Sequence, residues 1–181
     1  MRHVVCTHLD VDHAGGISDF PEAEVHVMRA EHDAAHARPT MNERRRYVAS
    51  HFTHGPKWKT HDAGGDTWKG FDAVRALADD EPDVLLVPLS GHTRGHAAVA
   101  VRTGSGWLLH CGDAYFHHHE MTENKRAPFG LRVFQQAIAV DDRARRHNQD
   151  RLRELVAGHG DVRVFCAHSK HELERQQGAR A

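Results

Sequence analysis

Four potential metal ligands lie within six residues near the start of the chain, in the segment His8-Leu9-Asp10-Val11-Asp12-His13. This segment follows a short apolar run at residues 3–7 and precedes two glycines, which predicts a strand end followed by a turn. Alternation along an extended strand end places His8, Asp10 and Asp12 on one side, and a turn would bring His13 back toward them. Histidine and carboxylate side chains gathered in this way favour a metal site over an ordinary polar loop.

Composition makes metal chemistry the leading question, because histidine accounts for 19 of the 181 residues and is the commonest metal ligand. With 39% hydrophobic and 27% charged residues, the chain is globular and has enough apolar material for a core. Its length predicts a single domain over residues 1–181. The 24 Lys and Arg residues balance 25 Asp and Glu residues, which argues against a nucleic-acid partner.

The sequence predicts a cytoplasmic protein that acts on a small molecule and has no membrane partner. The first residues lack the apolar run of a signal peptide, and no stretch approaches the roughly 18 apolar residues of a membrane span. Three cysteines in such a chain predict thiols, and Cys6, Cys111 and Cys166 are interpreted as small packing residues in preference to redox sensors or ligands. A homo-oligomer is compatible with this composition.

Short apolar runs alternate with longer polar segments, which predicts an α/β fold. Strands are expected at residues 3–7, 24–28, 83–88, 97–102, 106–110 and 162–167. Helices are expected at residues 29–37 and 142–157, the second with helical apolar spacing and a stop at Gly158. Residues 38–70 carry Pro, Gly and Trp without periodicity and are interpreted as a long irregular excursion, a candidate substrate loop.

Three further strand ends carry potential ligands beside small residues. They are Gly91-His92-Thr93-Arg94-Gly95-His96, His110-Cys111-Gly112-Asp113 and Cys166-Ala167-His168. With the first segment, four predicted strand ends each supply a histidine or a carboxylate. One such loop is easily a chance product of a histidine-rich composition, but four loops placed alike indicate a single site.

These segments resemble a known family. Thr7-His8-Leu9-Asp10-Val11-Asp12-His13-Ala14-Gly15-Gly16 is similar to the His-x-His-x-Asp-His signature of the metallo-β-lactamase-fold hydrolases. Residues 91–96 resemble that family's Gly-His-Thr-x-Gly-His segment, and Asp113 and His168 follow in the order of its bridging carboxylate and last histidine. The resemblance runs from residue 3 to about residue 170. It implies a metallo-β-lactamase-like αββα sandwich and a metal-dependent hydrolase.

The resemblance also implies a centre with two divalent metal ions. The implied ligands are His8, Asp10 and His96 for the first metal, Asp12, His13 and His168 for the second, and Asp113 as the bridge. A hydroxide held there would attack a small ester-type bond in a lactone, a thioester or a carboxylic ester. Asp12 is the expected catalytic residue, because its second oxygen can orient the water or carry a proton to the leaving group.

Two features depart from the family pattern. Asp10 stands where most of the family has histidine, and its carboxylate moves the preference of the site from zinc, still the first expectation, toward iron or manganese. His8 lies seven residues after Met1, whereas the family builds several strands before this motif. We therefore expect a domain that lacks its N-terminal strands and exposes a sheet edge, which lowers stability and promotes aggregation.

Two other functions stay open at this point. The Asp10 substitution is compatible with a di-iron redox protein of the same fold, and the missing strands are compatible with a catalytically silent truncated remnant. A β-lactamase is disfavoured because the chain shows no export signal. A nuclease is disfavoured by the balanced charge.

The remaining conspicuous residues receive weaker interpretations. His92 is expected to support the site from outside the ligand set, and Tyr115 is a candidate acid or oxyanion donor. The run His117-His118-His119 is interpreted as a solvated loop in preference to a loose metal site, and Arg44-Arg45-Arg46 as a solvated helix face. Equal weight is given to a pocket and to ordinary packing for His51, His54, Trp58, His61 and Trp68.

Overall fold

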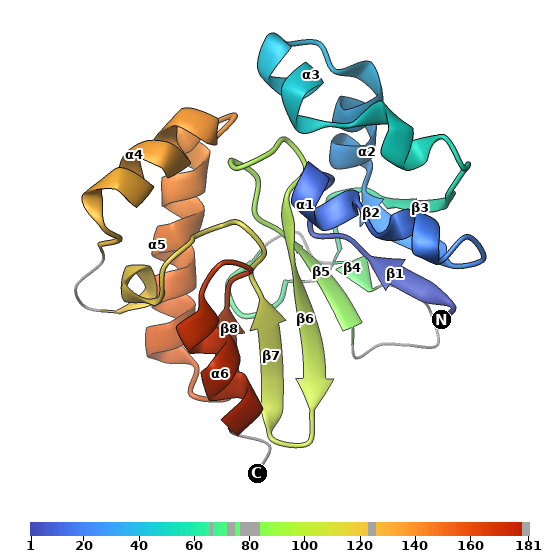
Figure 1. Cartoon of the computed structure of the whole chain (residues 1–181). Coiled ribbons are helices and arrows are strands. Elements are labelled where there is room, and N and C mark those ends of the chain that lie inside the picture. The colour runs from blue at the N-terminus through green and yellow to red at the C-terminus, as the bar shows by residue number, and fades with distance from the viewer. Residues whose placement is uncertain (66, 72–74, 77–83, 123–125, 179–181) are drawn as a thin grey trace.

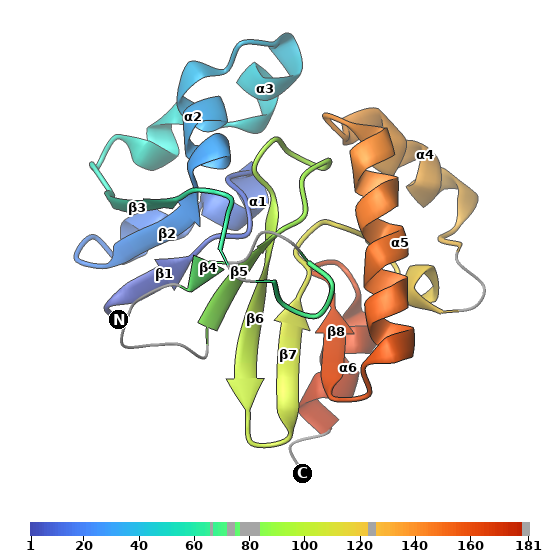
Figure 2. The same ribbon diagram turned by 180° about the vertical axis from the view of Figure 1, so that it is seen from behind.

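The computed structural model describes residues 1–65, 67–71, 75–76, 84–122 and 126–178. Two sheets stack face to face, and helices cover the outer face of each, as Figures 1 and 2 show. Met28 on one sheet packs against Leu86 and Ala97 on the other, so a small apolar cluster joins the two layers. The α/β class and the αββα layering predicted from the sequence are confirmed.

The smaller sheet is parallel and has the strand order β1-β2-β3. Its strands are β1 (His3–Val5), β2 (Glu24–Met28) and β3 (Lys57–His61). Val25 and Val27 on β2 are fully buried beneath the helical layer, where Leu9 and Tyr47 complete an apolar cluster. This packing fixes the end of β1, from which the His8 segment emerges.

The larger sheet has the strand order β4-β5-β6-β7-β8 and is antiparallel except for the parallel pair β7 and β8. Its strands are β4 (Arg75–Ala76), β5 (Val84–Pro88), β6 (Ala97–Thr103), β7 (Gly106–His110) and β8 (Val162–Phe165). The register pairs Val99 with His110 and His110 with Phe165. The expected start of β5 at Asp83 lies outside the described residues.

Helices and 3-10 turns connect the strands, and a side-chain cap marks the start of the longest helix among the described residues. They are α1 (Val11–Ala14), α2 (Arg29–Ala37), α3 (Met41–Arg46), α4 (Phe129–Ile138), α5 (Asp142–Gly158) and α6 (Lys170–Gly178), with 3-10 turns η1 (Ile17–Asp19), η2 (Ala49–Phe52) and η3 (His118–Met121). The Asp141 side chain accepts the Ala144 N–H and caps α5. None of the helices in the described segments has the length and apolar content needed to cross a bilayer.

Residues 38–70 contain more regular structure than expected. The excursion predicted to be irregular contains α3, η2 and β3. A capping box starts α3, because Thr40 accepts the Glu43 N–H and Glu43 accepts the Thr40 N–H. Strand β3 was missed because its alternation of lysine with Trp58 and Thr60 has no apolar run.

The segment after β1 also differs from its expected conformation. Alternation along an extended strand was expected to set the sides of Asp10 and Asp12, but Val11–Ala14 is a helical turn. Asp10 is the residue before that helix, with extended backbone angles, and Asp12 and His13 project from the first turn. Asp10 therefore reaches the site from extended backbone, and Asp12 reaches it from a helical turn.

We expect the metal-free chain to lose stability as the pH falls from about 6.5 toward 4. Burial, together with neighbouring histidines, lowers the pKa of His26 and of His110 to about 4. Their unfolded pKa is about 6.5, so the folded state binds fewer protons and its stability is lost on acidification. Urea unfolding in EDTA at pH 7 and pH 4.5 measures this, and an equal midpoint at both values contradicts it.

Candidate metal centre

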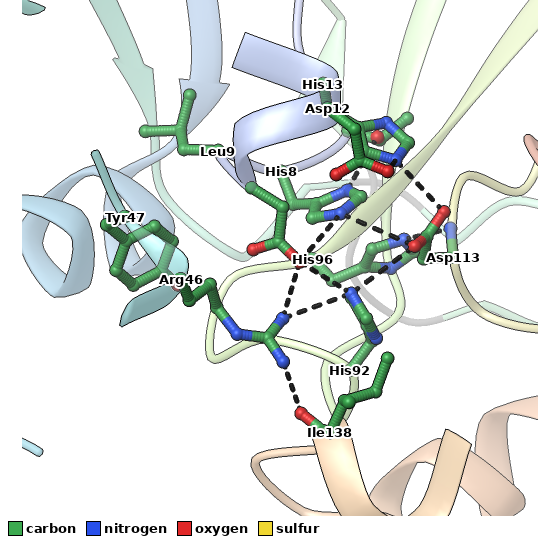
Figure 3. A network of polar contacts seen from close by, with 12 residues as sticks. His8, Leu9, Asp12, His13, Arg46, Tyr47, His92, His96, Asp113 and Ile138 are labelled. Atoms are coloured by element: carbon green, nitrogen blue, oxygen red, sulfur yellow. Dashed lines mark hydrogen bonds and ion pairs between the residues drawn. The ribbon is translucent and has the colours of Figure 1, made fainter. Parts of the chain in front are cut away.

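The potential ligands converge where four strands end. His8 follows β1, His92 lies in the loop between β5 and β6, Asp113 follows β7 and His168 follows β8. Figure 3 shows His8, His92 and Asp113 pointing toward one another, and His168 Nε2 lies 3.2 Å from Asp113 Oδ2. The clustering of strand ends predicted from the sequence is present in the structure.

The first group of potential ligands is His8, Asp10 and His92. The Asp10 Oδ2 atom lies 3.5 Å from His8 Nε2 and 3.0 Å from His92 Nε2. Both histidines are buried, at 0% and 2% exposure of the side chain. Thr7 Oγ1 lies 3.0 Å from His8 Nδ1, and the tautomer in which Nδ1 donates to it leaves Nε2 with a free lone pair.

The second group is Asp12, His13 and His168. The Asp12 Oδ2 atom lies 3.6 Å from His13 Nε2 and 3.7 Å from His168 Nε2. This group is more open than the first, because the Asp12 and His168 side chains are 54% and 40% exposed. It therefore faces the side from which a small molecule can enter.

Asp113 lies between the two groups. Its Oδ2 atom is 3.8 Å from His8 Nε2, 3.5 Å from His92 Nε2 and 3.2 Å from His168 Nε2. Its Oδ1 atom is 3.2 Å from His13 Nε2. A single buried carboxylate thus contacts members of both groups, which is the arrangement needed for a bridging ligand.

His96 does not join either group in this structure, and its assignment to the first metal stays a prediction. Its Nδ1–H donates to the Leu89 carbonyl at 3.1 Å, and its Nε2 accepts the Asp113 N–H at 2.9 Å. Both ring nitrogens of His96 are therefore hydrogen-bonded to the backbone in this structure. Gly112 permits this close approach, since a Cβ there would meet His96 Nε2 at 2.7 Å and the φ is +49°.

His92, which was expected only to support the site, lies with His8 and Asp10 in a group that could hold a metal ion. Both His92 and His96 belong to the segment 91–96, in which the family resemblance implies His96 as the ligand. The structure separates them by their surroundings. His92 Nε2 lies 3.0 Å from Asp10 Oδ2, 3.5 Å from Asp113 Oδ2 and 3.1 Å from Arg46 Nη1, whereas both ring nitrogens of His96 contact the backbone.

Several buried polar atoms of the centre lack hydrogen-bond partners within the described part of the chain, and a bound cation would supply a partner for them. His8 Nε2, Asp10 Oδ1 and Asp113 Oδ1 are buried without a hydrogen-bond partner among the described residues. Such groups are rare in folded proteins, because an unpaired buried polar atom costs free energy. Three unpaired atoms in a cluster of imidazoles and carboxylates fit divalent metal ions, which use this set of donors.

Attraction between the histidines and the carboxylates of the centre raises the pKa of His8 and lowers the pKa of Asp113. Burial acts to lower the pKa of His8, but Asp10 and Asp113 outweigh it and the net shift is upward. Burial acts to raise the pKa of Asp113, but His13, His168 and His8 outweigh it and hold the pKa below its usual range. The carboxylates are therefore ionised at neutral pH, as metal ligands must be.

Arg46 is a residue of the centre that the sequence interpretation missed. It was expected on a solvated helix face, yet its side chain is only 10% exposed and enters the centre from α3 (Figure 3). Its Nη1 atom donates to Asp10 Oδ2 at 2.8 Å, and Nη2 donates to the Ile138 carbonyl. Arg46 thus balances the carboxylate that stands where the family pattern has histidine.

Buried glutamates join the loops that carry the potential ligands. Glu31 accepts the Leu9 N–H and the Gly95 N–H, each at 3.0 Å, and so connects the loop after β1 to the loop after β5. Glu172 accepts the Tyr115 hydroxyl and the Cys166 N–H, and so connects the ends of β7 and β8. Neither glutamate has a periodic signal in the sequence, because each lies in a polar helix.

We expect Glu31→Gln to lower the free energy of unfolding by about 1–3 kcal/mol, the cost of leaving a buried donor unpaired. Glu31 also accepts the Tyr47 hydroxyl at 3.1 Å, and an amide cannot accept on both of its polar atoms. Urea denaturation of the chelated chain measures the change, with exposed Glu174→Gln as the control. Equal stability of the two variants would show that Glu31 does not hold the loops.

The other residues noted in the sequence lie away from the centre. Tyr115 is fully buried and donates to Glu172, so it is not an acid or oxyanion donor facing a substrate. The three cysteines are free and buried in apolar clusters, as expected for packing residues, and burial raises the pKa of each thiol. Trp58 and Trp68 pack against the two larger apolar clusters.

The centre forms the floor of a pocket of about 560 Å³. Phe116, Leu131, Phe134, Ala137 and Ile138 form an apolar wall, mainly from α4. On the other side, α3 supplies Asn42, Arg45 and Arg46. Within the excursion at residues 38–70, therefore, α3 is the part that lines the pocket.

Stacked sheets between helical layers, with histidine and aspartate at the strand ends, define the class of metallo-hydrolase folds. The chain belongs to the metallo-beta-lactamase superfamily, whose family model matches residues 1–168. Probable metallo-hydrolases of Mycobacterium tuberculosis and Mycobacterium bovis are each 44% identical to it over 169 residues, which are 93% of this chain and 54% of the relative. The chain spans about half the length of these curated relatives.

Solved structures share the fold. An N-acyl homoserine lactone hydrolase, with its product at the catalytic metal centre, superimposes with a TM-score of 0.70 and 22% identity, covering 98% of this chain and 58% of that one. A probable metal-dependent hydrolase from Staphylococcus aureus gives a TM-score of 0.72 with 15% identity, covering 94% of this chain and 55% of that one. At these identities the likeness concerns the fold.

Proposed function

We propose that this chain is a metal-dependent hydrolase that cleaves a small ester-type bond. The observation that carries the proposal is the pair of three-residue ligand groups with Asp113 between them, on the floor of a pocket open to small molecules. Names of the mycobacterial relatives and of the lactone hydrolase neighbour support the same class of reaction.

The first cation would be held by His8, Asp10 and His92, the second by Asp12, His13 and His168, with Asp113 shared. When bound, two such cations lower the pKa of water and polarise a carbonyl oxygen. Zinc is our first choice, with iron or manganese as alternatives. Arg46 favours zinc, because its charge offsets Asp10 and so reduces the extra negative charge that harder cations prefer.

Asp12 is proposed as the residue that moves the proton. Its carboxylate is the most exposed in the centre, lines the pocket and lies 3.6 Å from His13. One oxygen can serve a cation while the other orients water or delivers a proton to the leaving group. The buried Asp10 and Asp113 are enclosed by other side chains and are less able to exchange protons with a substrate.

The pocket favours a substrate with an apolar part beside the reacting carbonyl. Leu131, Phe134 and Ile138 would contact that part, while the carbonyl lies at the centre. A lactone, a thioester or a carboxylic ester fits this description. The three free cysteines are consistent with a reducing compartment, and we propose that the protein acts in the cytoplasm.

Hydrolysis of a panel of lactones, thioesters and carboxylic esters by the zinc-reconstituted chain tests the proposal. We expect turnover that EDTA abolishes and that added zinc restores. Full metal loading without turnover on any member would contradict a hydrolase and favour the silent remnant. Oxygen-dependent turnover of an iron-loaded chain with a visible absorption band would favour the redox alternative.

A further inference from the structure

A second cavity, of about 400 Å³, lies between α4, α5 and η3 and is separate from the metal centre. Figures 1 and 2 show α4 and α5 side by side in both views. The cavity is lined by an unusual number of arginines: Arg126, Arg132, Arg145, Arg146 and Arg153. Because the whole chain carries a net charge of −1, this positive lining is a local feature.

The acidic side chains in reach do not balance these arginines. Arg145 and Arg146 share a single carboxylate, that of Asp142, at 2.5 and 2.7 Å. Arg153 pairs with Asp150 at 2.5 Å. Among the described residues, Arg126 and Arg132 have no ion-pair partner, so the lining keeps an excess of positive charge.

The one buried carboxylate of the lining is already engaged. Glu120 is 4% exposed and accepts the Phe116 N–H and the His117 N–H, each at 3.1 Å. Gln135 Nε2 donates to both of its oxygens, and Arg145 Nη1 donates to Gln135 Oε1 at 3.1 Å. This network orders the base of the cavity and uses Glu120 as an acceptor, so the unpaired guanidinium groups remain available to an external anion.

We propose that this cavity binds a small phosphorylated molecule that carries at least two negative charges. Guanidinium groups present a planar set of donors that matches phosphate oxygens, and several of them together select a multivalent anion. Phe129 and Val133, exposed at 78% and 51%, offer an apolar surface at the rim for the organic part of the ligand. The cavity has the size of a small-molecule site.

Helix α4 separates this cavity from the catalytic pocket and lines both. Leu131 and Phe134 belong to the catalytic pocket, whereas Arg132 and Val133 belong to the arginine-lined cavity. Glu120 adds a second connection, since it holds the backbone of Phe116, which lines the catalytic pocket. An anion in the cavity would therefore restrict the movement of α4 and of the Phe116 backbone, which line the pocket at the metal centre.

Calorimetric titration of the full chain with inorganic pyrophosphate, without added metal, tests the proposal. We expect one binding site whose affinity falls with salt, because the contacts are ionic. The Arg126→Gln/Arg132→Gln variant should bind at least about tenfold more weakly, since it loses two charge-assisted contacts. Both arginines are exposed, so the variant should fold, which its thermal midpoint verifies.

The matched control is Arg2→Gln/Arg143→Gln, which removes two exposed arginines outside the cavity and should bind as the parent does. Citrate, a multivalent carboxylate, should bind more weakly than pyrophosphate, and equal binding would overturn the phosphate assignment. Absence of pyrophosphate binding would overturn the proposal. So would binding by the Arg126→Gln/Arg132→Gln variant that equals the parent, because the anion would then be held elsewhere.

Discussion

Asp113→Ala is expected to remove metal from both ligand groups at once. The Asp113 carboxylate lies within 3.2 to 3.8 Å of histidine nitrogens in each group, and no other described side chain contacts both groups to this extent. Without Asp113, each ligand group would lose a shared carboxylate donor, and the centre would keep its imidazoles with less negative charge to hold a cation. We expect the variant to retain little of the metal that the parent binds under equal zinc.

Elemental analysis after reconstitution with zinc and removal of free metal measures this effect. Asp33→Ala is the matched control, because Asp33 is exposed on α2 and should leave metal content unchanged. The thermal midpoint in EDTA checks that the variant folds. A full metal complement in the Asp113→Ala variant would show that the carboxylate does not bridge the groups.

Asp12→Asn is expected to lower turnover by roughly 10²–10⁴-fold, the usual contribution of a positioned acid or base. Asparagine keeps the size and one oxygen of the side chain but removes the basic oxygen. Because Asp12 is half-exposed and lines the pocket, the change should act on the reaction more than on folding. The effect should appear in kcat, with less change in KM.

Steady-state hydrolysis of the best lactone or thioester substrate, by metal-loaded parent and variant, provides the measurement. Metal content must be determined on the same samples, so that lost metal is separated from lost proton transfer. Asp19→Asn serves as a control, since Asp19 lies in η1 and does not line the pocket. Near-parent turnover by a fully loaded Asp12→Asn variant would remove Asp12 from the proposed mechanism.

Much of the fold follows from local sequence signals. The apolar runs at residues 24–28 and 106–110 and the helix at residues 29–37 were predicted with the bounds that the structure has. Valine recurs at alternate positions in β2, and β7 has the apolar run Trp107-Leu108-Leu109. Strand β3 has neither, and parallel pairing to β2 stabilises it, so only the tertiary structure reveals it.

The position of the centre could be predicted from the sequence, but its full set of residues could not. Ligand-rich segments after predicted strands indicated where His8, Asp113 and His168 meet. His92 lies with His8 and Asp10, whereas the ring nitrogens of His96 contact the backbone, and Arg46 reaches Asp10 only because α3 packs over the strand ends. Contacts between residues distant in sequence decide such details, and spacing along one chain does not encode them.

Anomalous diffraction from crystals of the zinc-loaded chain is the most direct test of the metal centre. The structure predicts one peak among His8, Asp10 and His92, a second among Asp12, His13 and His168, and Asp113 within bonding distance of both. A zinc position coordinated by His96 in place of His92, or zinc absent from these strand ends, would contradict this account of the site.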